Sequence, residues 1–129
     1  MKIAVIIVRV LLGLLFLFAS LTYFFNLITP PPLDGPVKTF NEGLAAAPYF
    51  MTVLKTTELL CGLAFLTGRF VPLAAVVISP VIVQIFLFHT FMDRTGLPVA
   101  IFLVIANLFL AYTYRRAYAT LFIARPALG

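Results

Sequence analysis

The sequence predicts an all-α integral membrane protein, an up-and-down bundle of four transmembrane helices with a short interfacial helix in the first extracytoplasmic loop. Of its 129 residues, 64% are hydrophobic and 10% are charged. Soluble domains typically carry about 25% charged residues, so this chain could not cover a surface in water. Its length fits a single domain over 1–129. Long uncharged stretches reach the ~20 residues that cross a bilayer core.

The first transmembrane helix is expected near 3–28, because no charge occurs between Val10 and Leu33. A cleaved signal peptide is the alternative. However, the apolar run continues to Ile28, which is too long for the apolar core of such a peptide. We therefore expect a retained helix.

Two short segments are predicted to lie at the membrane surfaces. The loop 29–48 opens with a run of three prolines, which cannot continue a helix. Val37, Phe40 and Leu44 then recur at helical spacing and indicate a short helix lying on the outer leaflet. Residues 115–123 combine arginines with apolar side chains and indicate a similar segment at the opposite surface.

Hydropathy alone leaves the segment 49–68 undecided, because Lys55 and Glu58 interrupt its apolar run. If this segment crosses, six basic residues share the side of the termini and two lie on the other side. Cytoplasmic loops carry an excess of Lys and Arg, so four crossings with both termini in the cytoplasm are predicted. The remaining two helices are placed near 70–91 and 97–114.

Polar side chains inside a span are costly, so each needs a partner or a function. Arg9 lies in the cytoplasmic third, but all the others are placed in the outer half of the bundle. These others are Asn26, Lys55, Glu58, Gln84, His89 and Asn107. The asymmetry predicts a polar cavity in the outer half, and these six residues are its candidate ligand-binding residues.

The charged pair allows two interpretations. Lys55 and Glu58 are three residues apart and share a helix face. Gly62 lies on the same face, and because it has no side chain a neighbouring helix can approach there. The two charges either form an ion pair that only neutralises itself, or line a water- or ligand-accessible cavity. In the second case Glu58, near the midplane, would handle a proton.

The other polar residues also allow structural interpretations. Asn107 shares its face with small residues, which is typical of a packing seam between helices. Gln84 lies one turn after Pro80 and could satisfy the backbone carbonyl that the proline frees. His89 ends an apolar stripe and is an interfacial residue, a partner of the carboxylate of Asp93 or a ligand-binding residue.

The rare residues exclude several kinds of chemistry. The single cysteine, Cys61, cannot form an internal dithiol pair. One cysteine and one histidine are also too few for a structural zinc site. No metal site and no covalently bound cofactor are therefore predicted, and a redox role needs a diffusible or partner-held cofactor. The basic residues are scattered rather than clustered, which excludes nucleic-acid binding.

Several short motifs resemble the DoxX family of small four-helix membrane proteins. They are Arg9-Val-Leu-Leu-Gly13, Lys55-Thr-Thr-Glu58-Leu-Leu-Cys-Gly62, Gly68-Arg69-Phe70-Val71-Pro72-Leu73-Ala74, the Phe88-His89 pair and Gly96-Leu97-Pro98. With the proline-rich loop, the resemblance covers nearly the whole chain. Gln84 is a departure, because the family pattern has an asparagine two or three residues before the histidine.

The resemblance implies a bacterial inner (cytoplasmic) membrane protein with a connection to quinones, since the family includes the membrane subunit of a thiosulfate:quinone oxidoreductase. This chain would then be an enzyme only as the membrane subunit of a quinone-linked oxidoreductase. Lys55, His89 and Asn26 would donate hydrogen bonds to carbonyl oxygens, and Glu58 would relay a proton. The expected partners are the lipid bilayer, a quinone and a soluble or membrane redox protein. A homo-oligomer is left open.

Two other functions remain open at this point. The chain could be a structural or assembly subunit whose buried polar residues only fix helix packing and a partner. It could also be a small transporter in which the Lys55/Glu58 pair gates a substrate. Transport is the weaker alternative, because four short spans without an internal repeat leave little room for alternating access.

Overall fold

The computed structural model describes residues 2–29, 31–125 and 127–128. Within these residues the chain is helical, without strands, and the predicted all-α class is confirmed. The elements are α1 (Lys2–Phe24), α2 (Gly35–Ala46), α3 (Phe50–Thr67), α4 (Val71–Phe91), η1 (Arg94–Gly96), α5 (Leu97–Thr113) and η2 (Arg115–Phe122), the two η elements being 3-10 helices.

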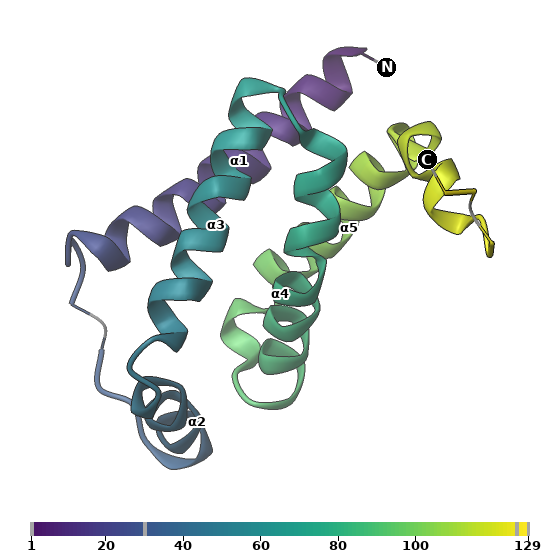
Figure 1. Cartoon of the computed structure of the whole chain (residues 1–129). Coiled ribbons are helices and arrows are strands. Elements are labelled where there is room, and N and C mark those ends of the chain that lie inside the picture. Colours follow the sequence, from purple (N-terminus) through teal and green to yellow (C-terminus); the bar gives the residue numbers. More distant parts are fainter. Residues whose placement is uncertain (1, 30, 126, 129) are drawn as a thin grey trace.

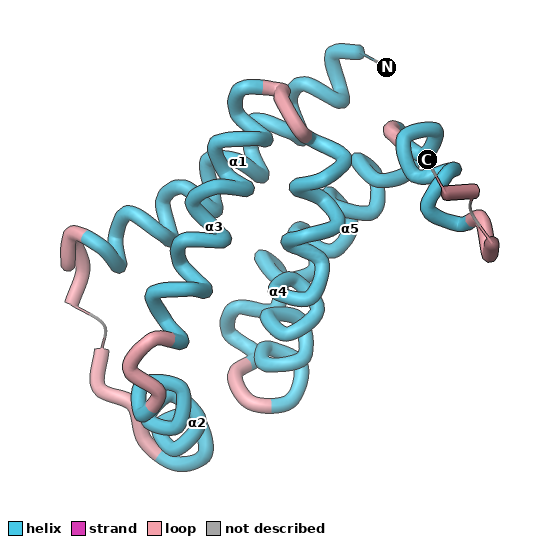
Figure 2. Tube along the Cα trace, in the orientation of Figure 1, coloured by secondary structure: helices cyan, strands magenta, loops and turns pink. Residues whose placement is uncertain are grey.

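Four long helices form the bundle, and α2 lies at the end where the α1–α2 loop returns, which we call the α2 end (Figures 1 and 2). Helix α1 packs along α3, α4 packs along α5, and contacts of α3 with α4 and of α1 with α5 complete the ring. Each of the four contributes a fully buried side chain to a common core: Leu12, Phe65, Ile78 and Leu110. The predicted four-helix bundle is confirmed.

The outer surface of the bundle is apolar. Four segments are long and apolar enough to cross a membrane: Lys2–Phe24, Phe50–Thr67, Val71–Phe91 and Arg94–Thr113. Large apolar side chains point outward from all four, for example Phe18, Leu60, Val83 and Leu108. Such a surface is stable against lipid and not against water. The chain is a multi-pass membrane protein.

Helix α1 ends at Phe24, four residues before the predicted Ile28. Asn26 adopts a left-handed conformation with φ 51°. Its N–H donates to the carbonyl oxygen of Tyr23 at 3.4 Å, and the N–H of Leu27 donates to that of Thr22 at 3.1 Å. This pair of bonds is the Schellman arrangement that satisfies the last carbonyls of a helix. The apolar run of the sequence continues past Phe24, but the backbone cap ends the helix there.

Helices α1 and α3 approach closely where two glycines meet. A Cβ added to Gly13 would lie 2.9 Å from the carbonyl oxygen of Gly62, and a Cβ added to Gly62 would lie 3.1 Å from that of Gly13. A side chain at either position would therefore push the two backbones apart. The predicted close approach at Gly62 is confirmed.

Helix α3 ends at a left-handed glycine that also accommodates an arginine. Gly68 has φ 75°, and its N–H donates to the carbonyl oxygen of Ala64 at 3.0 Å. The guanidinium of Arg9 from α1 lies directly against Gly68, where any side chain would collide with it. A cation at the C-terminus of a helix is favourable because the last carbonyls carry partial negative charge.

The two short segments predicted outside the spans are both helical. Helix α2 occupies the middle of the 29–48 loop, and η2 follows α5. The hydroxyl of Tyr118 in η2 donates to the carbonyl oxygen of Pro72 at 2.7 Å, which fixes η2 against the start of α4. Their positions at the lipid surfaces stay a prediction.

Candidate functional site

A groove of about 770 Å³ lies at the α2 end, between α2, α3 and α4. Its walls are mostly apolar, and several are aromatic: Phe40, Tyr49, Phe50 and Phe88. Three of the predicted polar residues also line it, namely Lys55, Gln84 and His89. A largely apolar cavity with a few polar groups is the usual form of a small-molecule site.

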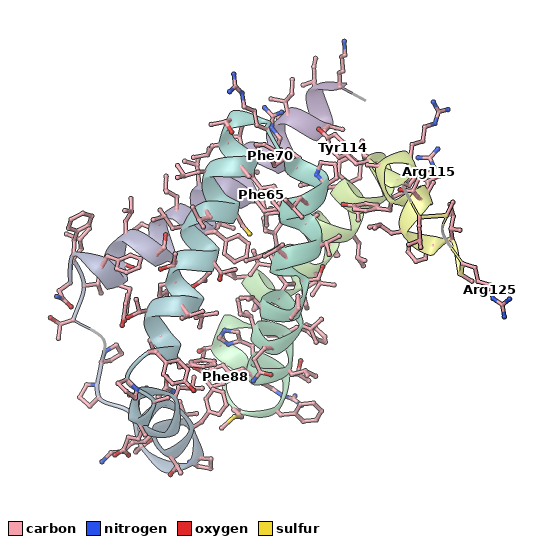
Figure 3. All side chains as sticks on the ribbon, in the orientation of Figure 1. Phe65, Phe70, Phe88, Tyr114, Arg115 and Arg125 are labelled. Atoms are coloured by element: carbon pink, nitrogen blue, oxygen red, sulfur yellow. The ribbon has the colours of Figure 1, made fainter. Side chains whose placement is uncertain are left out.

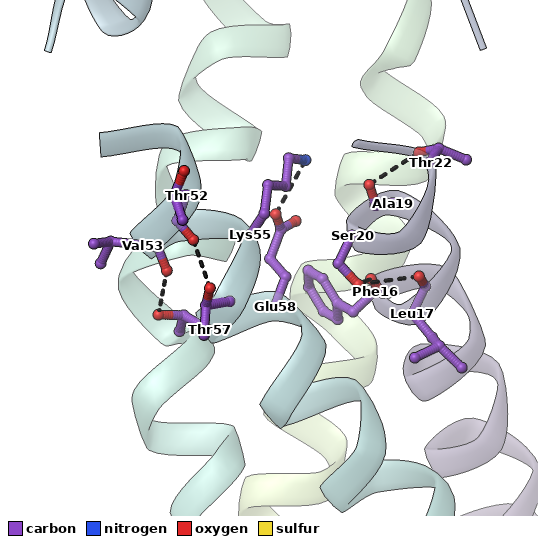
Figure 4. A network of polar contacts seen from close by, with 11 residues as sticks. Phe16, Leu17, Ala19, Ser20, Thr22, Thr52, Val53, Lys55, Thr57 and Glu58 are labelled. Carbon is purple, nitrogen blue, oxygen red and sulfur yellow. Dashed lines mark hydrogen bonds and ion pairs between the residues drawn. The ribbon is translucent and has the colours of Figure 1, made fainter. Parts of the chain in front are cut away.

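Lys55 and Glu58 form an ion pair on the side of α3 that faces α1, opposite Phe16 and Ser20 (Figure 4). The ammonium nitrogen of Lys55 lies 3.1 Å from Oε2 of Glu58. The side chain of Lys55 is 19% exposed and that of Glu58 is 4% exposed. The pair therefore joins a lysine in the groove wall to a carboxylate buried behind it.

The buried carboxylate of Glu58 is incompletely satisfied. Its Oε2 is within ion-pair distance of Lys55, but among the described residues no group meets hydrogen-bond geometry with this oxygen. A carboxylate oxygen accepts up to two hydrogen bonds, and leaving them unmade in a buried place is costly. The electrostatic attraction of Lys55 is therefore what keeps this group tolerable in its charged form.

An aromatic contact closes α2 over the groove. The rings of Phe40 on α2 and Phe88 on α4 lie with their centroids 5.3 Å apart. Phe88 in turn meets the ring of His89 edge-on, at 5.1 Å. Figure 3 shows Phe88 at the α2 end of the bundle. Aromatic pairs at these distances contribute about 0.5–1.5 kcal/mol beyond their buried area, so α2 is held in place by a modest contact.

His89 is fixed with one nitrogen committed to the backbone. Its Nδ1 lies 2.9 Å from the carbonyl oxygen of Asp93. A carbonyl can only accept, so Nδ1 carries the proton and Nε2 of the neutral ring is left as an acceptor. The ring lies directly on Gly96, where a Cβ would collide with it. Gly96 is thus required for the orientation of His89. The contact of His89 is with the backbone carbonyl of Asp93, whereas the sequence suggested the carboxylate of Asp93 as its partner.

The turn after α4 is held by a local hydrogen-bond network. The hydroxyl of Thr95 donates to Oδ1 of Asp93 at 2.6 Å, and the N–H of Thr95 donates to the same oxygen at 3.2 Å. These two bonds hold the pKa of the Asp93 carboxyl below its usual value. The turn positions η1, and with it Gly96, beneath His89.

Gln84 lines the groove on α4, one turn after Pro80. Proline has no N–H, so the helical hydrogen bond to the carbonyl oxygen of Val76 is missing. The side chain of Gln84 is exposed. It is placed to meet a ligand lying in the groove.

The remaining two predicted residues lie elsewhere. The amide nitrogen of Asn107 on α5 donates to the carbonyl oxygen of Ala75 at 3.2 Å and to the hydroxyl of Ser79 at 3.3 Å, both on α4. It is buried, and its role is to join α5 to α4. Asn26 is exposed and caps α1. Neither residue lines the groove.

The aromatic wall of the groove was missed as a group by sequence reasoning. Phe40 and Phe88 stood out only in the helical spacing of the loop and in the family motif, and Tyr49 had no signal of its own. In a membrane protein, aromatic side chains face lipid as readily as a ligand, so composition cannot separate the two. The contact between residues 40 and 88 depends on how α2 folds back onto α4.

Among the described residues, no three side chains of His, Cys, Asp or Glu gather in an arrangement that could hold a metal ion. The groove instead offers an ammonium, an amide and an imidazole to a ligand. These groups suit the oxygen atoms of a small organic molecule.

A comparison with protein families gives a match to the DoxX family model over residues 4–90, more than half of the chain. The chain belongs to the DoxX family. The matched region runs from the start of α1 almost to the end of α4 and so contains Lys55, Glu58, Gln84 and His89. No curated protein and no solved structure matches the chain.

Proposed function

We propose that the groove binds a lipid-soluble quinone and that this DoxX protein serves as a membrane subunit of a redox system. It would lie in the bacterial inner membrane with both termini in the cytoplasm. The observation that carries the proposal is the position of Lys55. Its ammonium is part of the groove wall, and a carboxylate buried behind it holds it there.

The groove fits a flat ring with polar oxygens. Its volume of about 770 Å³ lies within the range of roughly 300–1,000 Å³ typical of small-molecule sites. Phe40 and Phe88 offer ring faces, and the groove runs along α3 and α4, whose outward surfaces are apolar. A ligand with a long apolar tail can therefore leave its tail in the bilayer while its ring occupies the groove.

The polar groups of the groove each have a distinct role. Lys55 and the amide of Gln84 donate hydrogen bonds to ring oxygens. His89 accepts through Nε2 from a hydroxyl when its ring is neutral and donates to a carbonyl oxygen when its ring is protonated. Glu58 is the carboxylate that can hold a proton behind Lys55. A bound quinone would supply two-electron, two-proton carrier chemistry.

In this proposal the electrons come from another protein. The chain has one cysteine and therefore no dithiol of its own. A soluble or membrane redox partner would exchange electrons with the ligand in the groove, while the residues of this chain bind the ligand and place protons.

A second function, that of an assembly subunit, is favoured by one specific observation. The amide nitrogen of Asn107 joins α5 to α4, as that of a structural residue would, while its buried Oδ1 has no hydrogen-bond partner among the described residues. If Lys55 and Glu58 act in the same way, the chain only holds its shape and its partner.

Quinone retention separates the two functions. The wild-type protein is purified in mild detergent, and co-purifying quinones are extracted and quantified by mass spectrometry per mole of protein. The Lys55→Met/Glu58→Gln double variant keeps the shape of the pair but removes both charges. Lys38→Met on α2, an exposed position outside the groove, is the control.

We expect the double variant to fold and reach the membrane while it loses the quinone, and the control to retain it. A folded double variant that retains quinone as the wild type does would contradict quinone binding through Lys55 and favour the assembly function.

A further inference from the structure

The charges of the bundle are strongly segregated. The four carboxylates lie in α2 or next to it, in the middle of α3 and just before η1. At the end formed by the start of α1, the α3–α4 turn and η2, the charged side chains of the described residues are all basic, and we call it the cationic end. Its basic residues are Lys2, Arg9, Arg69, Arg115, Arg116 and Arg125. Figure 3 shows Arg115 at this end and Arg125 on the chain that follows η2.

Arg115, the first residue of η2, is held against the last turn of α5. Its guanidinium carbon lies 4.3 Å from the ring centroid of Tyr112, and its Nη1 donates to the carbonyl oxygen of Tyr112 at 3.0 Å. A guanidinium has five N–H donors, so most remain available for another acceptor. A second guanidinium, Arg116, follows directly, and both line a hollow of about 380 Å³ with Tyr114.

The segment beside this hollow has apolar side chains that are exposed on the surface. Leu121 is 71% exposed, Phe122 is 85% exposed and Ile123 is 51% exposed. Yet η2 is not a loose tail, because Tyr118 donates to the carbonyl oxygen of Pro72. A fixed segment with exposed apolar residues next to arginines is the arrangement of an interfacial element, which places apolar groups in acyl chains and cations among headgroups.

We propose that Arg115 and Arg116 bind the phosphate of an anionic phospholipid, whose acyl chains lie against Leu121 and Phe122. Guanidinium groups bind phosphate oxygens through paired, charge-assisted hydrogen bonds. Among the described residues, the cationic end has no Asp or Glu side chain to compete for the guanidinium donors. A phospholipid contacts both parts of this surface, because its phosphate lies in the charged hollow and its acyl chains lie against the apolar edge formed by Leu121 and Phe122.

A free phosphate ion or an acidic protein would match only part of this surface. Inorganic phosphate would use the arginines and leave the apolar edge exposed. An acidic protein would need the arginines to face away from the membrane, whereas the apolar edge draws η2 towards it. The lipid is therefore the occupant that the structure favours, and the other two are outcomes to be distinguished.

The test uses the full chain in detergent micelles doped with equal amounts of phosphatidylglycerol and phosphatidylcholine. Native mass spectrometry counts the lipids of each kind that remain bound. The variants are Arg115→Gln/Arg116→Gln, which removes the charges, and Leu121→Gln/Phe122→Gln, which removes the apolar edge. Arg94→Gln, an exposed arginine at the α2 end, is the matched control.

We expect phosphatidylglycerol to be retained in preference to phosphatidylcholine. The preference should fall about fivefold for each arginine removed, as for basic residues at an anionic membrane surface. The Leu121→Gln/Phe122→Gln variant should retain less of both lipids while it keeps the preference. Arg94→Gln should behave as the wild type.

Three results would overturn the proposal. Equal retention of the two lipids by the wild type would show that the site does not select an anionic headgroup. An equal loss in Arg94→Gln would show that only net charge matters. Displacement of the lipid by millimolar inorganic phosphate, with no effect of the Leu121→Gln/Phe122→Gln change, would show a simple anion site. Thermal unfolding of each variant establishes that it is folded.

Discussion

Replacing Lys55 by methionine tests whether the pair in α3 depends on attraction between its two charges. Methionine keeps much of the length of the lysine stem but leaves Glu58 without its cation. The side chain of Glu58 is 4% exposed, so water cannot replace the ammonium that lay 3.1 Å away. The fold must then bury a carboxylate that has lost its cation.

The structure sets the size of the effect. At 3.1 Å, two unit charges attract by about 5 kcal/mol when the effective dielectric constant is about 20. Removing one partner of a buried ion pair typically costs about 3–5 kcal/mol, and Lys55→Met should reduce the free energy of unfolding by about that amount.

Glu58→Gln should cost less, about 1–2 kcal/mol, because Lys55 is 19% exposed and can extend its ammonium into the groove.

Equilibrium unfolding with sodium dodecyl sulfate, followed by circular dichroism in mixed micelles, measures each variant. The Lys55→Met/Glu58→Gln double variant should recover much of the loss, which gives a coupling energy of about 2 kcal/mol or more in the mutant cycle. Lys38→Met on the exposed face of α2 controls for loss of a lysine. Strictly additive losses would refute a charge-coupled pair.

Three further predictions follow from other parts of the molecule. Gly13→Leu should destabilise the bundle by about 1–3 kcal/mol through overpacking against α3, measured in the same unfolding assay; an unchanged stability would contradict the tight contact. Single cysteines at Asp34 and Leu128, in a cysteine-free background, should label from opposite sides with an impermeant maleimide, that at Asp34 from outside; labelling of both from outside would rule out cytoplasmic termini. Because the pKa of the Asp93 carboxyl is lowered in the folded protein, its charged form stabilises the turn above the ordinary carboxyl pKa, and this stabilisation is lost as the pH falls through the lowered pKa. Thr95→Val removes the hydroxyl donor, so hydrogen exchange of the turn should show the loss of stability at a higher pH. An unchanged pH dependence would contradict the hydrogen bonds from Thr95.

The sequence by itself determined the fold class and the course of the chain. Charge-free stretches and the distribution of Lys and Arg predicted four spans, and the three-residue spacing of Lys55 and Glu58 predicted their pairing. These are local properties of the chain, since hydropathy is summed over a window and an ion pair at this spacing is set by the geometry of one helix. The end of α1 was misplaced because a left-handed Asn26 stops a helix without any change in hydropathy.

Only the tertiary structure decided which polar residues share a site. Gln84 and His89 line the groove with Lys55, whereas Asn107 turns to α4 and Asn26 caps α1. The physical reason is that these helices are apolar on every side, because lipid and protein core are equally apolar environments. Periodicity therefore does not reveal which face of a helix meets its neighbours. The groove exists because α2 folds back onto α3 and α4, a contact between segments that are distant in the sequence.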